Sequence, residues 1–200
     1  MTLILASSSP RRRQLLNEAG YDFGVIEPDP TAECGICSRE TPPEMVARLA
    51  YQKAANVIGK VDLGLVVACD TVAECVGIIL GKPENREHAR EMLNRLRGKP
   101  HAVYSGLCVW DKQSAKRSVT VAVSRLRMDQ IPDKDIEAYL DTELWVGKSG
   151  AFGFQDGPPW IHLIEGTASN VVGLPMDALR NLLVEFNYPF KVNGEVKTTD

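Results

Sequence analysis

Hydroxyl and guanidinium groups cluster near the N-terminus, directly after a short apolar segment. Residues 7–9 are three consecutive serines, and Pro10, Arg11 and Arg12 follow them. A helix that begins at Pro10 would present free backbone N–H groups and its positive dipole end to an anion. Arginine binds phosphate oxygens through paired N–H donors, and cations in a first helical turn oppose the dipole unless an anion is bound. The segment therefore indicates an anion site, with a serine cap and solvated arginines as the alternative.

Three more ionisable residues stand where they could meet such an anion. Asp70 directly follows the apolar run 65–69, which is typical of a strand buried on both faces. A carboxylate at the end of such a strand lies at the sheet edge where α/β proteins bind ligands. Lys53 falls on the apolar face of a predicted helix, and Lys82 lies in a Gly-Lys-Pro loop. The alternatives are a turn aspartate, a lysine that extends to solvent and an ordinary loop lysine.

Lys148 belongs to a Gly-Lys-Ser triplet that is similar to the end of a phosphate-binding P-loop. That motif requires a glycine five residues before Gly147, where this chain has Thr142, and no clear strand precedes it. The sequence therefore contains no P-loop. It also lacks the motifs of dinucleotide-binding proteins, zinc proteases and serine hydrolases, and its three histidines are too scattered for a metal cluster or a triad.

The five cysteines favour reduced thiols over a disulfide framework, because their number is odd and three of them lie in apolar segments. Cys34 and Cys37 form a lone C-x-x-C pair with no second pair and no well-spaced histidine. A zinc or redox site at this pair remains the alternative to two incidental loop cysteines.

Length and composition favour one globular domain. The chain has 200 residues, of which 44% are hydrophobic, and 23 Lys and Arg against 26 Asp and Glu give a net charge of −3. We expect a single domain at 1–188 and a polar C-terminal tail at 189–200 that frays. The acidic balance gives no footprint for a nucleic acid polymer, so an anionic partner must be small and bound by locally grouped cations.

No apolar run approaches the roughly 18–20 residues that span a bilayer, so no membrane partner is expected. The N-terminal segment also lacks the basic and then apolar order of a signal peptide. We therefore expect a cytoplasmic protein.

The periodicity predicts strands and helices that alternate at first, followed by a part in which strands dominate. This order is typical of a mixed α/β sheet, with two lobes as one arrangement. A late hairpin is expected between 152–155 and 160–164, and an adjoining strand or hairpin at 72–80. The other expected strands are 3–6, 23–26, 65–69, 102–110 and 119–126, and helices are expected to begin near residues 10, 43, 86, 133 and 175.

Six short segments, in this order and spacing, carry a resemblance to a known family. They are LILASSSPRR at 3–12, LAYQKA at 49–54, CDT at 69–71, GKP at 81–83, GAFGFQ at 150–155 and VGLP at 172–175. The chain resembles the Maf family of nucleoside triphosphate pyrophosphatases from Leu3 to about Phe186. The resemblance implies an elongated α/β fold like that of the inosine triphosphate pyrophosphatases, with a mixed sheet and two lobes around a deep cleft. It also implies a homodimer that hydrolyses a nucleoside triphosphate to the monophosphate and pyrophosphate with a divalent metal ion, Mg²⁺ or Mn²⁺.

The resemblance also assigns roles to residues. It implies that Asp70 is catalytic and that five residues bind the substrate, namely Ser7, Arg12, Lys53, Lys82 and Lys148. Asp70 could act as the base for the attacking water or as a metal ligand, because a carboxylate with a pKa of about 4 is a weak base on its own. Glu33 is the candidate for a second metal ligand.

Three further positions distinguish substrate subgroups within the family. Arg11, Thr71 and Gln155 are similar to the subgroup that acts on dTTP and UTP, and modified pyrimidine triphosphates are further candidates. The subgroup that acts on 7-methyl-GTP has an aromatic residue, Gln and Glu instead, so a 7-methyl-GTP-type activity is one alternative. Another is a nucleotide-binding regulator of cell division and septum formation, against which the intact Asp70 and Lys82 argue.

Overall fold

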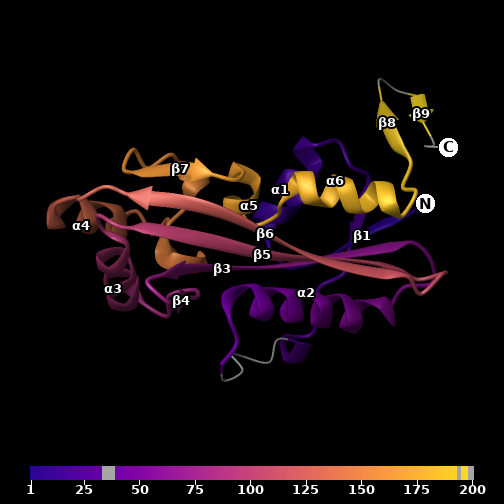
Figure 1. The fold of residues 1–200 in the computed structure, drawn as a ribbon, viewed down its shortest axis with the longest axis horizontal. Helices are drawn as coiled ribbons and strands as arrows, with labels where there is room; N and C mark the ends of the chain where they lie inside the picture. The colour runs from indigo at the N-terminus through magenta and orange to yellow at the C-terminus, as the bar shows by residue number, and fades with distance from the viewer. Residues whose placement is uncertain (33–38, 193–194, 198–200) are drawn as a thin grey trace.

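A long mixed sheet forms the centre of the molecule in the computed structural model, which describes residues 1–32, 39–192 and 195–197 (Figure 1). The strand order is β2-β1-β3-β5-β6-β7, and β4 pairs with the far end of β3. The strands are β1 Leu3–Ala6, β2 Phe23–Val25, β3 Leu65–Cys75, β4 Ile78–Leu80, β5 Pro100–Asp111, β6 Arg117–Met128 and β7 Ile161–Glu165. The helices are α1 Pro10–Glu18, α2 Pro42–Ile58, α3 Arg86–Leu96, α4 Asp133–Asp141, α5 Ala168–Val172 and α6 Met176–Glu185, with 3-10 turns at Pro30–Ala32, Ser149–Ala151 and Phe154–Asp156.

An open edge in the middle of β3 positions the site. Strand β1 runs parallel to β3 but ends at Ala6, opposite Ala68, and β4 pairs antiparallel with β3 only from Ala73 onward. Within the described part of the chain, residues 69–72 therefore have no strand neighbour on this side, while β5 pairs with them on the other. Among the described residues, the stretch therefore lacks ladder partners on one side, and three of its residues, Asp70, Thr71 and Val72, line a cavity at this edge.

Helix α2 covers one face of the sheet, and α1 and α6 lie on the other (Figure 1). The start of α2 is fixed by Glu44, whose carboxylate accepts hydrogen bonds from the backbone N–H of Thr41 at 2.9 Å and from its hydroxyl at 2.6 Å. Gly106 of β5 lets α2 approach closely, because a Cβ at this position would overlap the carbonyl oxygen of Val46. The helix presents a buried stripe to the sheet, formed by Met45, Val46, Leu49, Ala50, Lys53, Ala54 and Val57.

The hydrophobic core is divided along the sheet. One cluster surrounds α3, α4 and the β4 end of the sheet, while two others lie on opposite faces at the β1 end, under α6 and under α2. The expected α/β class with an elongated mixed sheet is confirmed. The arrangement in two lobes stays a prediction.

Two predicted elements differ from the structure. The strand expected to stop at residue 69 runs on to Cys75, so Asp70 and Thr71 lie within β3 rather than after it. The hairpin expected between 152–155 and 160–164 is wrong: β7 pairs with β6, and Phe154–Asp156 is a 3-10 turn. The edge of β6 at Arg125–Met128 supplies the ladder partners of β7, and Gly157, which is in the left-handed region, turns the chain between the 3-10 turn and β7.

The C-terminal segment, expected as a fraying tail, contains a second small sheet. Strand β8 Phe190–Val192 pairs antiparallel with β9 Glu195–Lys197. The Asn-Gly dipeptide at 193–194 is a common hairpin signal in sequences. The domain limit at residue 188 stays a prediction.

Candidate active site

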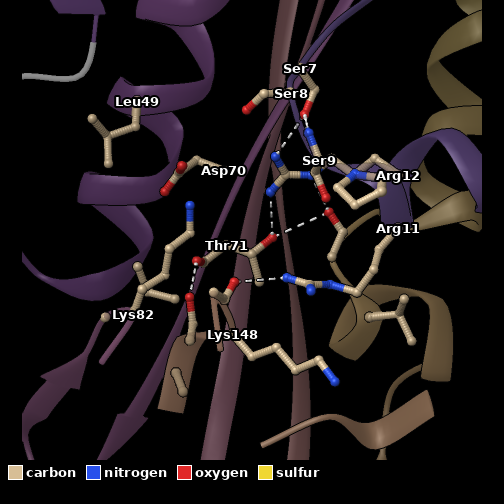
Figure 2. Close-up of a pocket in the computed structure, with 18 of the residues that line it drawn as sticks. Ser7, Ser8, Ser9, Arg11, Arg12, Leu49, Asp70, Thr71, Lys82 and Lys148 are labelled. Atoms are coloured by element: carbon tan, nitrogen blue, oxygen red, sulfur yellow. Dashed lines mark hydrogen bonds between the residues drawn. The ribbon is translucent and has the colours of Figure 1, made fainter. Parts of the chain in front are cut away.

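A cavity of about 770 Å³ opens at the uncovered edge of β3. Its walls come from segments far apart in the sequence: the loop between β1 and α1, helix α2, the middle of β3, residues 81–82, residues 146–149 and the turn after α5. Figure 2 shows these side chains converging from both sides of the central strands. All but one of the site residues proposed from the sequence line this cavity; Glu33 lies outside the described residues.

Asp70 and Lys53 form a buried ion pair on the α2 side of β3. The Nζ atom of Lys53 lies 2.5 Å from Oδ1 of Asp70, and the two side chains are 6% and 12% exposed. The lysine that the sequence placed on an apolar helix face therefore does not extend to solvent. Its charge offsets the cost of burying the Asp70 carboxylate and fixes the orientation of that group.

Thr71 points to the opposite face of β3, where it meets Arg12 (Figure 2). Arg12 donates three hydrogen bonds: from Nη2 to Oγ1 of Thr71 at 3.2 Å, from Nη1 to Oγ of Ser7 at 3.2 Å, and from Nε to the carbonyl of Gly173 at 2.7 Å. All three acceptors are uncharged. The guanidinium is thus held in place while its charge is left for a ligand.

Arg11 and Lys82 add two more cations to the cavity. Arg11 donates from Nη2 to the carbonyl of Gly147 at 3.0 Å. Burial lowers the pKa of Arg11, the neighbouring charge of Arg12 lowers it further, and Asp156 raises it. Lys82 is exposed and extends toward the part of the cavity that holds Asp70 (Figure 2). Among residues 1–32, 39–192 and 195–197, no carboxylate pairs with Arg11, Arg12 or Lys82.

The segment 147–156 closes the other side of the cavity. The Ser149 hydroxyl donates to the backbone carbonyl of Thr71 at 3.1 Å, at the open edge of β3. Lys148 is buried and forms an ion pair with Asp156, and in Figure 2 its side chain runs away from Asp70. Gln155 lines the cavity and is exposed. The proposed binding role of Lys148 stays a prediction.

The family model described as "Maf-like protein" matches residues 2–186. This chain belongs to the Maf family. A dTTP/UTP pyrophosphatase of Rhodopirellula baltica is 56% identical over 199 residues, which cover 99% of this chain and 86% of the relative. A dTTP/UTP pyrophosphatase of Geotalea uraniireducens is 40% identical, over 90% of this chain and 94% of the relative.

The Maf chain also shares its fold with a solved structure. A HAM1 protein from Coxiella burnetii superposes with a TM-score of 0.52 at 13% identity, over 92% of this chain and 99% of that chain. The expected likeness to the inosine triphosphate pyrophosphatase fold is confirmed at the level of the fold.

The described part of this Maf chain contains no group of three or more His, Cys, Asp or Glu side chains that could hold a metal ion. Glu33, the second expected ligand, lies outside the described residues, as do Cys34 and Cys37. Mg²⁺ is commonly bound by one or two carboxylates together with substrate phosphates. The Asp70 carboxylate at the cavity therefore fits a metal site that phosphate oxygens complete.

Several polar residues behind the site were not identified from the sequence. Ser105 is fully buried on β5 directly across from Thr71, and their hydroxyl oxygens lie 2.8 Å apart. Asn170 of α5 is also buried and donates from Nδ2 to the Ser124 hydroxyl at 2.9 Å and to the carbonyl of Val103 at 3.2 Å. Ser124 belongs to the alternation of small polar residues in β6, whereas no local pattern in the sequence marks Ser105 or Asn170. Together they fasten α5, and with it the Gly173 carbonyl that holds Arg12.

Proposed function

We propose that this chain is a nucleoside triphosphate pyrophosphatase that hydrolyses dTTP and UTP to the monophosphate and pyrophosphate. The observation that carries the proposal is the cavity at the open edge of β3. A carboxylate fixed by Lys53 faces the same space as three cations without carboxylate partners in the described residues, Arg11, Arg12 and Lys82. The named activity of the relatives in Rhodopirellula baltica and Geotalea uraniireducens supports the same reaction.

The cations suit a polyphosphate. A nucleoside triphosphate carries about four negative charges, and fixed donors aimed at its oxygens stabilise the charge that develops during cleavage. Arg12 is held by three neutral acceptors, so its remaining N–H groups can bind phosphate oxygens. The N-terminus of α1 adds a favourable dipole next to these groups.

Asp70 orients the attacking water or takes its proton. Lys53 contacts Oδ1 of the carboxylate and holds the group in one orientation, so Oδ2 is the oxygen that would act on the water. A divalent metal ion, Mg²⁺ or Mn²⁺, would be held by Asp70 and the phosphate oxygens, with Glu33 as a candidate second ligand. When bound, the ion neutralises charge on the phosphate oxygens.

The choice of base is assigned to Thr71, Gln155 and Arg11, all of which line the cavity. A neutral amide and a hydroxyl suit the donor and acceptor groups of a pyrimidine, whereas a carboxylate suits the N–H edge of a guanine. This set supports dTTP and UTP over 7-methyl-GTP, and extends to modified pyrimidine triphosphates.

The test is the release of pyrophosphate from a panel of triphosphates with Mg²⁺ or Mn²⁺, with both products identified. Fast conversion of dTTP and UTP to monophosphate and pyrophosphate is expected, and a chelator should abolish it. Release of orthophosphate, or a preference for 7-methyl-GTP, would contradict the proposal. Tight binding without turnover would favour a nucleotide-binding regulator of cell division, and stoichiometric zinc in the purified protein would favour a site at Cys34 and Cys37.

A homodimer and a cytoplasmic location complete the proposal. The thiols of Cys69, Cys75 and Cys108 are free and buried, which suits a reducing compartment. No helix in the described residues is long and apolar enough to cross a bilayer. Light scattering on the purified chain would test the dimer.

A further inference from the structure

Asp156 stands next to the cation cluster but has no role in the proposed reaction. Its carboxylate pairs with Lys148, and the two side chains are only 18% and 11% exposed. It also acts on Arg11, since it opposes the lowering of the Arg11 pKa. Five basic side chains line the cavity, and the negative charge of Asp156 acts on two of them, Lys148 and Arg11.

The loop at residues 147–156 holds the Asp156–Lys148 pair in place. Asp156 and Lys148 lie against the backbone of Gly153, where a Cβ would overlap both the Asp156 carboxylate and the Lys148 ammonium. The N–H of Gly153 donates to the Tyr139 hydroxyl at 3.0 Å, which anchors the loop to α4. Burial raises the pKa of Tyr139 to about 12, so the hydroxyl stays protonated. The pair is therefore a fixed, half-enclosed contact and not a chance encounter of two surface side chains.

Among the described residues, the other carboxylates near the cavity are engaged elsewhere. Glu27 pairs with Arg13 at 2.6 Å, and Asp29 pairs with Lys60 at 3.0 Å, while neither Arg13 nor Lys60 lines the cavity. Asp70 is held by Lys53 for the reaction itself. Asp156, in contrast, pairs with a cation that lines the cavity, so its charge offsets part of the positive charge around Lys148.

We propose that Asp156 is a charge-balancing residue, which engages Lys148 in the free enzyme and limits how tightly the cavity holds the pyrophosphate product. The proposal rests on the proposed function, because it concerns release of that reaction's product. Five cations bind a departing polyanion as well as an arriving one, and slow product release limits many enzymes. A carboxylate that is paired with Lys148 and acts at longer range on Arg11 lowers the positive potential at the site and so speeds release.

The test is calorimetric titration of the whole protein with pyrophosphate and Mg²⁺. Asp156→Asn is expected to bind pyrophosphate roughly three- to tenfold more tightly than the wild type, and pyrophosphate should inhibit its turnover at correspondingly lower concentration. Asp156→Glu keeps the charge and should bind like the wild type. Asp133→Asn is the matched control, because Asp133 is 87% exposed and pairs with Arg97, and neither residue lines the cavity.

Unchanged or weaker pyrophosphate binding in Asp156→Asn would overturn the proposal, since it would mean that the carboxylate orients Lys148 toward the ligand or has no influence. Asp156→Ser is a second neutral variant in case the asparagine variant fails to fold. Failure of the proposed function would show separately, as no pyrophosphate release from the triphosphate panel, because the calorimetric measurement needs no turnover.

Discussion

Asp70 and Thr71 are neighbours in β3 whose side chains project to opposite faces of the sheet, and both border the same cavity. Asp70 meets Lys53 of α2 at 2.5 Å, while Thr71 accepts a hydrogen bond from Arg12 of α1 at 3.2 Å. This is possible because β1 and β4 leave residues 69–72 uncovered between them. The alternation of a strand thus brings to one edge, from its two faces, the carboxylate proposed to act on water and the hydroxyl proposed to select the substrate.

Asp70→Asn is expected to lower kcat by at least a hundredfold, because an amide neither accepts a proton from water nor holds a metal ion well. Nucleotide affinity should stay the same or increase, since the Lys53 charge is no longer offset. Steady-state kinetics and calorimetric binding of a non-hydrolysable triphosphate analogue measure the two effects. Normal turnover in this variant would remove Asp70 from the mechanism.

Arg12→Lys is expected to raise KM roughly tenfold to a hundredfold. A lysine ammonium cannot reach Ser7, Thr71 and Gly173 together in the planar arrangement that the guanidinium makes. Arg13→Lys is the matched control, because Arg13 is the next residue and does not itself line the cavity, although its partner Glu27 lies at the cavity wall. Equal KM values for the two variants would contradict the assigned role of Arg12.

The joint exchange of Thr71→Gln and Gln155→Glu should shift kcat/KM from UTP toward 7-methyl-GTP. The structure adds a second expectation: because the Thr71 hydroxyl also holds Arg12, the exchange should raise KM for every triphosphate. Thr71→Ser keeps the hydroxyl and serves as the control. An unchanged ratio of kcat/KM for the two substrates would show that the base lies elsewhere.

From the sequence, most strands and helices and the convergence of the cations on one site could be predicted. The residues with which the site residues pair could not. The apolar run at 65–69 and the alternation in 119–126 identify central strands, because burial on one or both faces leaves a local pattern. The extension of β3 through Asp70 was missed, since its ladder partner Gly106 is 36 residues away and leaves no local signal. Ser105 and Asn170 were missed because their hydrogen-bond partners are also far away in the sequence, and no local pattern marks Asp156 as the partner of Lys148.

Ser105→Ala tests whether the buried hydroxyls behind the site position Thr71. The variant loses the 2.8 Å contact with Thr71 but creates almost no cavity, so its stability should fall by only about 1 kcal/mol. We expect KM for dTTP and UTP to rise several-fold with a smaller change in kcat, and Ser105→Thr to restore much of the loss. A variant with altered thermal stability but unchanged KM would limit Ser105 to a structural role.

His101 should make the stability of this protein depend on pH below neutrality. It is buried, its Nε2 has no hydrogen-bond partner, its ring lies edge-on to Phe152 at 5.4 Å, and burial lowers its pKa from 6.5 to about 4. The unfolded chain therefore binds a proton at His101 before the folded chain does. The contribution of the neutral imidazole is complete above pH 6.5 and is lost as the pH falls toward 4, to a total of about 3 kcal/mol.

His101→Phe removes this titration while it keeps an aromatic ring against Phe152. Urea unfolding at several pH values between 7 and 4 should show that the wild type loses more stability than the variant over this range, with the difference growing as the pH falls. Carboxylates titrate in both proteins, so their effect cancels in the comparison. Parallel pH profiles for the two proteins would show that the imidazole is not held neutral by its surroundings.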